Sequence, residues 1–282
     1  MKKVSLILVL VSLLSSNVLA QQLKISESEL KEKLDSILHE GNLLYKYEKA
    51  AWISNELAFK NPTVKAEFHG YLTYEEQSEI KSIILAENLQ TCIAEYTFED
   101  NFDQPKYVKI EKREVSDKEK TLIEVRQKIL ENILDDGKYE VSVPKGGYNL
   151  NFILLPFADK YKLYMITGTT EPNVVPFGND YIFIADENGE IESWHKFHSQ
   201  LIPSPTITGG NNSRKNNAKS NKVTGLIHTH LPSTPLMTAT DICTFLLYAP
   251  IYDLKTLTVL HGRVRVAMKY WLKENKITTE YF

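Results

Sequence analysis

Residues 223–250 read VTGLIHTHLPSTPLMTATDICTFLLYAP, and this stretch decides how the second half of the chain folds. It begins as a short apolar strand, passes through a loop rich in Pro, Ser and Thr, and ends in an apolar helix that Pro250 closes. His228 and His230 lie two apart on the strand, so their side chains point to the same face. Thr238 fits a helix N-cap, which puts Asp241 in the first turn. We therefore expect two imidazoles and a carboxylate to converge.

This combination of residues is typical of a metal centre. Two imidazoles, one carboxylate and one open position describe a catalytic zinc site. The sequence therefore predicts that His228, His230 and Asp241 bind Zn²⁺. A structural alternative remains open, because Thr-x-x-Asp is close to a capping box and Asp241 would then only satisfy backbone donors.

The spacing from His228 to Asp241 resembles a known motif. His228-x-His230, seven residues, Thr238, two residues and Asp241 is similar to the H-x-H-x7-S-x2-D motif of JAB/MPN-type (JAMM) metalloproteases, with Thr in place of the usual Ser. The same fold family includes RadC-type proteins. The resemblance covers the C-terminal half only, and it implies a JAB/MPN-like (cytidine-deaminase-like) α/β domain with a mixed sheet. It also implies hydrolysis of an amide or isopeptide bond, in which zinc-activated water attacks the carbonyl.

The resemblance further implies a general base and an oxyanion donor. The family uses a Glu at the start of an upstream strand as the base, but here the corresponding hairpin begins Gly-Asn-Asp-Tyr, at residues 178–181. Asp180 is our first candidate for the base and Glu171, in the preceding loop, is the second. Thr238 replaces the family Ser, whose hydroxyl helps to hold the oxyanion, and Thr offers the same donor.

The chain divides into four predicted parts. Residues 1–20 combine two lysines, an apolar run and a small-residue end, which is typical of a cleavable signal peptide. Residues 21–138 alternate helical and strand patterns and read as an accessory α+β domain. Residues 139–282 form the JAMM-like domain, and residues 209–222 within it are a polar insertion that we expect to be mobile. The fold class predicted for the whole chain is α+β.

Periodicity and turn signals predict the elements. In the first part we expect helices over 26–41 and 42–60, a strand over 63–72, a helix starting at Thr73, strands over 92–98 and 107–115, and a helix over 116–136. In the second part we expect hairpins over 150–167, 181–201 and 254–270.

Two further residue types need an interpretation. His195 and His198 lie three apart on a predicted strand and would face opposite sides, so we expect structural or surface roles. The alternative that one of them contacts substrate stays open. Cys92 and Cys243 are too few for a disulfide scaffold, and we favour two unpaired thiols.

Two functions follow from these patterns. The first is a secreted or periplasmic zinc-dependent metallopeptidase that acts on a peptide or protein, for example a cell-wall peptide. The second is a catalytically inactive JAB/MPN-like binding or assembly protein, since fold alone does not establish activity. The formal charge of −3 gives no sign of a nucleic-acid partner, and we expect no stable membrane anchor after signal cleavage. A zinc deaminase would need H-x-E and C-x-x-C, and a serine hydrolase a G-x-S-x-G elbow; the sequence has none of these.

Overall fold

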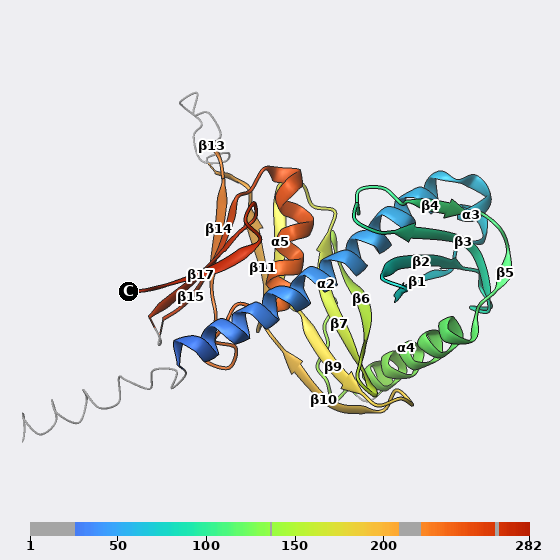
Figure 1. Ribbon diagram of the computed structural model, residues 1–282, viewed down its shortest axis with the longest axis horizontal. Coiled ribbons are helices and arrows are strands. Elements are labelled where there is room, and N and C mark those ends of the chain that lie inside the picture. Colours follow the sequence, from blue (N-terminus) through green and yellow to red (C-terminus); the bar gives the residue numbers. More distant parts are fainter. Residues whose placement is uncertain (1–25, 136, 209–220, 263–264) are drawn as a thin grey trace, which may run out of the picture.

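The computed structural model describes residues 26–135, 137–208, 221–262 and 265–282. Over these residues the chain is an α+β fold with several separate sheets (Figure 1). The predicted signal peptide, residues 1–20, and most of the predicted insertion, residues 209–220, lie outside the described residues.

A long N-terminal helix organises the molecule. The described helices are α2 (Glu27–Lys60), α3 (Pro62–Glu67), α4 (Asp117–Asp135) and α5 (Ala239–Tyr252). The sequence predicted a helix end at Gly41, and this is wrong because α2 runs through it. A Cβ at Gly41 would lie 2.6 Å from Ile242 Cβ, so the glycine allows α2 to approach α5 closely. Here packing between helices outweighs the helix-ending tendency of glycine.

The first sheet corrects two more predictions. It contains β1 (Gly70–Glu76), β2 (Glu79–Leu85), β3 (Thr91–Phe98), β4 (Tyr107–Lys109) and β5 (Arg113–Glu114). The helix expected from Thr73 is instead the β1–β2 hairpin, whose turn residues Gln77 and Ser78 both have positive φ, as a type I′ turn requires. The strand expected over 63–72 begins as α3, because Asn61 caps its first turn and Pro62 is its first residue. The helix expected over 116–136 is confirmed as α4.

The second sheet contains two of the three predicted hairpins. It has the order β10-β9-β7-β6, and a separate pair joins β8 to β11. These strands are β6 (Tyr148–Phe157), β7 (Lys160–Thr169), β8 (Val174–Gly178), β9 (Tyr181–Ala185), β10 (Ile191–Lys196) and β11 (Leu201–Pro205), followed by the short β12 (Ile207–Thr208) and β13 (Asn221–Lys222). The expected strand up to Leu201 is interrupted, since β10 ends at Lys196 and four residues separate it from β11.

The third sheet contains both parallel and antiparallel pairs. It has the order β14-β15-β16-β17, with β14 (Gly225–Thr229), β15 (Thr256–His261), β16 (Val266–Trp271) and β17 (Lys276–Tyr281). The β14–β15 pair is parallel and the other pairs are antiparallel. Helix α5 makes the crossover that a parallel pair needs. The prediction that Pro250 closes this helix is wrong, because α5 continues past Pro250 to Tyr252 and Asp253 is its C-cap.

One hydrophobic core crosses the predicted boundary near residue 138. Figure 1 shows α2 passing from the first sheet to α5 and the C-terminal strands. Buried residues of α2, such as Leu44 and Ala50, belong to the same core as Phe245 of α5 and Met268 of β16. The accessory region thus supports the elements that carry the metal-site motif. Within the described part of the chain, none of the helices combines the length and the apolar character needed to cross a bilayer.

Candidate metal centre

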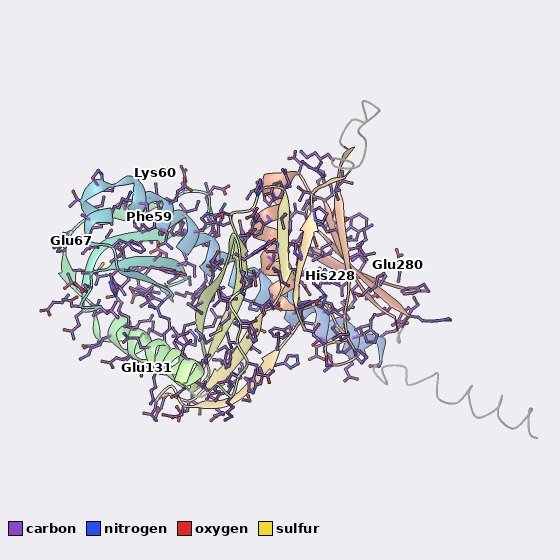
Figure 2. The ribbon with its side chains drawn as sticks, turned by 180° about the vertical axis from the view of Figure 1, so that it is seen from behind. Phe59, Lys60, Glu67, Glu131, His228 and Glu280 are labelled. Carbon is purple, nitrogen blue, oxygen red and sulfur yellow. The ribbon has the colours of Figure 1, made fainter. Side chains whose placement is uncertain are left out.

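The two histidines of the motif come from the end of β14. Side chains alternate along this strand, so His228 and His230 are buried whereas Thr229 between them is exposed. The parallel partner β15 fixes their position, with His228 opposite Val259 and the His230 N–H donating to the Leu260 carbonyl at 2.9 Å. Figure 2 places His228 beside α5, among the C-terminal strands. The prediction that both imidazoles share one face is confirmed.

The carboxylate of the motif comes from the first turn of α5. Thr238 and Asp241 form the capping box: Asp241 Oδ2 accepts from the Thr238 N–H and hydroxyl, both at 2.8 Å. The Thr238 hydroxyl in turn accepts from the Asp241 N–H at 3.1 Å. These bonds hold the side chain in one orientation, and its other oxygen, Oδ1, accepts no hydrogen bond. The capping role and a ligand role are therefore compatible.

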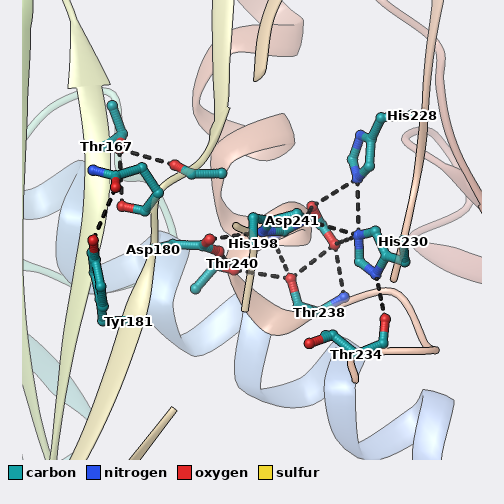
Figure 3. Close-up of polar contacts among 12 residues, drawn as sticks. Thr167, Asp180, Tyr181, His198, His228, His230, Thr234, Thr238, Thr240 and Asp241 are labelled. Atoms are coloured by element: carbon teal, nitrogen blue, oxygen red, sulfur yellow. Dashed lines mark hydrogen bonds and ion pairs between the residues drawn. The ribbon is translucent and has the colours of Figure 1, made fainter. Parts of the chain in front are cut away.

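The three predicted ligands meet at one point (Figure 3). His228 Nε2 lies 3.1 Å from His230 Nε2 and 3.2 Å from Asp241 Oδ1. His230 Nε2 lies 3.3 Å from Asp241 Oδ2. The strand end and the helix start thus build one compact set of donors.

A fourth donor, His198, joins this set and was missed by the sequence analysis. Its Nε2 lies 2.8 Å from His230 Nε2 and 3.5 Å from Asp241 Oδ1. The prediction treated 190–201 as an unbroken strand, on which His195 and His198 would face opposite sides. Because β10 ends at Lys196, His198 lies in a loop and turns into the site. The polar pair after it, Ser199-Gln200, was the available loop signal.

For His230 and His198, hydrogen bonds to the far ring nitrogen decide which nitrogen faces the site, whereas Nδ1 of His228 is buried without such a partner. His230 Nδ1 lies 2.8 Å from the Leu236 carbonyl and 3.1 Å from the Thr234 carbonyl. A carbonyl only accepts, so Nδ1 carries the proton and Nε2 presents a lone pair. His198 Nδ1 likewise donates to Asp180 Oδ1 at 2.7 Å. Such outer partners are characteristic of metal-ligating histidines.

The four side chains of the cluster are buried, so their charges act on one another rather than being balanced by water. The exposed fractions are 5% for His198, 6% for His228, 7% for His230 and 2% for Asp241. Burial raises the pKa of Asp241, but the three imidazoles outweigh it and hold that pKa well below its usual value. Burial lowers the pKa of His198, but the carboxylates of Asp180 and Asp241 outweigh it and raise that pKa to about 9. The cluster attracts positive charge to its centre.

The donor set fits a metal ion. Ligand atoms about 2.0–2.1 Å from a tetrahedral zinc ion lie about 3.3 Å from one another. The five donor distances given above, which involve both oxygens of Asp241, run from 2.8 to 3.5 Å, and with one ligand atom from each residue all four atoms lie within 4.8 Å of one another. His198 Nε2 and His230 Nε2 lie 2.8 Å apart and need a proton or a cation between them; the raised pKa of His198 supplies a proton in the metal-free protein, and a metal ion would take its place. Asp241 Oδ1 is buried without a hydrogen bond. This buried group can therefore bind a metal ion.

The remaining predicted site residues lie at different distances from the cluster. Asp180 is buried behind His198, and its second oxygen accepts from the Thr240 hydroxyl. Glu171 is exposed and packs against Gly147, outside the group of donors. Of the paired histidines, His195 contacts the Thr234 hydroxyl at 3.1 Å and is not among the donors. Both cysteines are buried and free.

Comparisons with family models, with curated proteins and with solved structures give no match for this chain. The resemblance to JAMM metalloproteases therefore stays a prediction that depends on the motif residues. The geometry of the four donor side chains does not depend on this resemblance.

Proposed function

We propose that this protein is a zinc-dependent hydrolase of amide or isopeptide bonds. The observation that carries the proposal is the buried convergence of three imidazoles and one carboxylate, backed by Asp180. Imidazole donors suit zinc as well as copper, iron and nickel, and zinc adds Lewis acidity without redox chemistry. The proposed substrate is a peptide or protein outside the cytoplasm, for example a cell-wall peptide, because residues 1–20 read as an export signal.

In this proposal the motif residues hold the metal and a separate pair moves the proton. His228, His230 and Asp241 would bind zinc, which lowers the pKa of water and polarises a carbonyl. Thr238 keeps Asp241 in place, because its one hydroxyl proton is donated to that carboxylate.

Proton transfer is assigned to His198 rather than to a carboxylate. Both oxygens of Asp180 are engaged, one with His198 and one with Thr240, and Glu171 lies outside the cluster. Asp180 fixes the His198 tautomer. In the metal-free protein two carboxylates raise the pKa of His198 to about 9, and the charge of a bound zinc ion would oppose that shift, so that Nε2 could accept a proton from the attacking water and return it to the leaving amine. Asp180 is then a positioning residue for the base.

A second candidate function is a non-catalytic protein that uses the metal for stability or assembly. It is favoured by the 2.8 Å distance between His198 Nε2 and His230 Nε2, which suits a fourth ligand better than a base behind a water. Four protein ligands would close the site, and closed zinc sites are structural.

The His198→Ala variant separates the two candidates. Zinc-loaded wild type, His198→Ala and the control His195→Ala would be assayed on quenched peptide libraries that include isopeptide-linked lysines. For a hydrolase we expect wild-type cleavage, a loss of about 10²- to 10⁴-fold in His198→Ala with zinc retained, and little change in the control.

For the closed site we expect no cleavage by the wild type and a loss of zinc affinity in His198→Ala. Substitution with Co²⁺ adds an independent readout, because azide can replace a metal-bound water and change the visible absorption, whereas four protein ligands leave no exchangeable position. A wild type that cleaves no substrate and whose Co²⁺ absorption does not respond to azide would end the hydrolase proposal.

A further inference from the structure

A cavity of about 250 Å³ opens between α2, the β6–β7 hairpin and α5. Glu48 and Leu247 are buried parts of its wall, whereas Asn149 and Thr170 are exposed at its mouth. None of the four metal donors lines it. Pockets for drug-sized ligands measure about 300–1,000 Å³, so this one suits a smaller molecule of about one ring.

A glycine shapes one wall of the cavity. Gly168 of β7 lies opposite Asn149 of β6, and a Cβ there would lie 2.8 Å from Asn151 Nδ2 and 3.0 Å from Asn149 Oδ1. The missing side chain therefore leaves room for two amide groups, which a hydrogen bond from Asn149 Nδ2 to Asn151 Oδ1 joins. This leaves Asn149 Oδ1 as an acceptor at the mouth. A glycine inside a strand often marks a place where a ligand approaches closely.

Three residues of the lining carry hydrogen-bond donors that the protein leaves unused. Trp52 Nε1, Asn55 Nδ2 and the Tyr71 hydroxyl bond to no residue in the described part of the chain. The three side chains are partly buried, and none of these three atoms is fully buried without a partner. Each donor therefore has accessible surface, unlike Asn55 Oδ1, which is buried. Because polar groups in enclosed places nearly always have partners, these donors are available to a ligand.

The charge of the lining favours a neutral ligand. Among the described residues that line the cavity there is no lysine, arginine or histidine, so an anion would find no positive charge. The one carboxyl group, Glu48, is 6% exposed and offers a cation almost no surface. Burial also raises the pKa of Glu48 to about 7, which the hydrogen bond from Asn151 only partly offsets. An apolar ligand would leave the polar atoms of the wall without partners.

Aromatic side chains complete the wall. The ring centroids of Trp52 and Tyr248 lie 5.8 Å apart, and both residues line the cavity. The Tyr248 hydroxyl accepts from the Thr169 N–H at 3.0 Å, which leaves its ring as the surface offered to a ligand. An aromatic side chain of this kind combines an apolar body with a polar end. The ligand should therefore carry both carbon surface and groups that donate and accept hydrogen bonds.

We propose that this cavity binds one neutral sugar ring, with its hydroxyl groups bonded to Trp52 Nε1, Asn55 Nδ2 and Asn149 Oδ1. Its carbon atoms would pack against the rings of Trp52 and Tyr248. A hydroxyl both donates and accepts, so a sugar can satisfy the unused donors and the acceptor together. The ring is either a free monosaccharide or the end of a glycan chain, since both present the same groups. The site does not depend on the proposed hydrolase activity.

Nitrogen-15 NMR of the wild type tests the proposal, because the chain has three tryptophans and each gives one indole N–H signal. The sugars to be titrated are D-glucose, D-galactose, D-mannose and N-acetyl-D-glucosamine. We expect at least one of them to shift the Trp52 signal saturably, with a Kd below about 10 mM. The signal of Trp271, whose Nε1 donates to the Thr278 hydroxyl, should not move. Trp52→Phe assigns the signals.

Two glycine variants test the wall of the cavity. Gly168→Ala pushes the two asparagine amides aside and should weaken binding of that sugar by about tenfold. Gly70→Ala, at the start of β1, places a Cβ no closer than 4.0 Å to any neighbour and should leave the affinity unchanged. Equal or tighter binding of a disaccharide that ends in the same sugar would assign a glycan end, and weaker binding a free monosaccharide.

Two results would overturn the proposal. One is a Trp52 signal that responds to none of the four sugars up to about 100 mM. The other is equal affinity for the bound sugar and for its amino or carboxylate analogue, which would show that the site does not select a neutral ligand. Both results come from the wild type alone and therefore decide the matter even if Gly168→Ala does not fold.

Discussion

Two buried polar clusters of this molecule differ in how completely the chain satisfies them. At the start of α4, Glu119 accepts from both Arg113 guanidinium nitrogens, from the Ser116 N–H and from the Tyr74 hydroxyl, each at 2.7 Å. At the start of α5, Asp241 faces three imidazoles, and its Oδ1 accepts no hydrogen bond. In the first cluster the protein itself supplies the hydrogen-bond donors that the buried carboxylate of Glu119 needs.

The difference separates a structural role from a binding role. Arg113 supplies the positive charge that Glu119 needs, so no ligand is required there. The α5 cluster has its lone pairs aimed at a common centre and has no lysine or arginine among its donors. A buried polar network that is only partly satisfied is costly, and a cation would complete it. Four expectations follow, from the largest effect to the smallest.

The largest expected effect is stabilisation by zinc. Zinc at about 1,000 times its Kd should raise the free energy of unfolding of the metal-free wild type by about 4 kcal/mol. Asp241→Ala should abolish this gain because a ligand is lost, whereas Asp253→Ala, which removes an exposed carboxylate at the other end of α5, should retain it. Urea titration with and without zinc measures both. Equal stabilisation of the two variants would contradict the account.

The next effect concerns the cluster around Glu119 at the start of α4. Arg113→Met should lower the free energy of unfolding by about 3 kcal/mol, because it leaves the Glu119 carboxylate buried without its partner. Lys112→Met removes an exposed charge next to it in the chain and should cost less than about 1 kcal/mol. Chemical denaturation at neutral pH compares them. Zinc should change the loss of unfolding free energy in neither variant.

The pH dependence of stability should report Glu119. Burial raises its pKa, but Arg113, Ser116 and Tyr74 together lower it from 4.5 to about 2. The folded state therefore binds this proton less readily than the unfolded state, and the stabilisation is present above about pH 4.5 and lost as the pH falls toward 2. Between about pH 6 and pH 3 the wild type should lose about 2 kcal/mol more than Glu119→Gln. Equal losses of unfolding free energy in the wild type and in Glu119→Gln would show that the pKa of Glu119 is not lowered in the folded state.

The smallest effect tests the residue behind the metal donors. Asp180→Asn keeps the shape of the side chain but weakens its hold on His198 Nδ1, so zinc affinity should fall by about tenfold. Asp159→Asn, in the exposed turn between β6 and β7, should not change it. Competition with a chromophoric chelator gives both dissociation constants. An unchanged affinity in Asp180→Asn would mean that His198 needs no support to reach the site.

The sequence predicted the parts of the site that lie close together in the chain. The spacing of His228, His230, Thr238 and Asp241 follows from one strand, one loop and one helix start, and these local patterns are reliable. His198 lies 30 residues before His228, and its orientation depends on where β10 ends. The residue at which a strand ends is set by its pairing with neighbouring strands. The alternation of side chains along the sequence does not reveal that pairing.

The fold shows the same division between local and non-local causes. Helix α4 and the β6–β7 and β15–β16 hairpins were predicted, because each carries its own capping or turn signal. The β1–β2 hairpin was read as a helix, since Ile80, Ile83 and Ile84 also fit a helical face. The sheet pairing of β2 with β1 and β3 decided between the two. Likewise, only contact with Ile242 explains why Gly41 lies inside a helix.

Anomalous diffraction at the zinc edge, on crystals of the protein loaded with one equivalent of zinc, tests the central claim most directly. The account predicts a single peak bonded to His228, His230 and Asp241, with His198 Nε2 either bonded to the zinc or facing it across a water, and with Asp180 behind His198 in both cases. A peak elsewhere on the chain, or the four side chains in place with no peak between them, would contradict it.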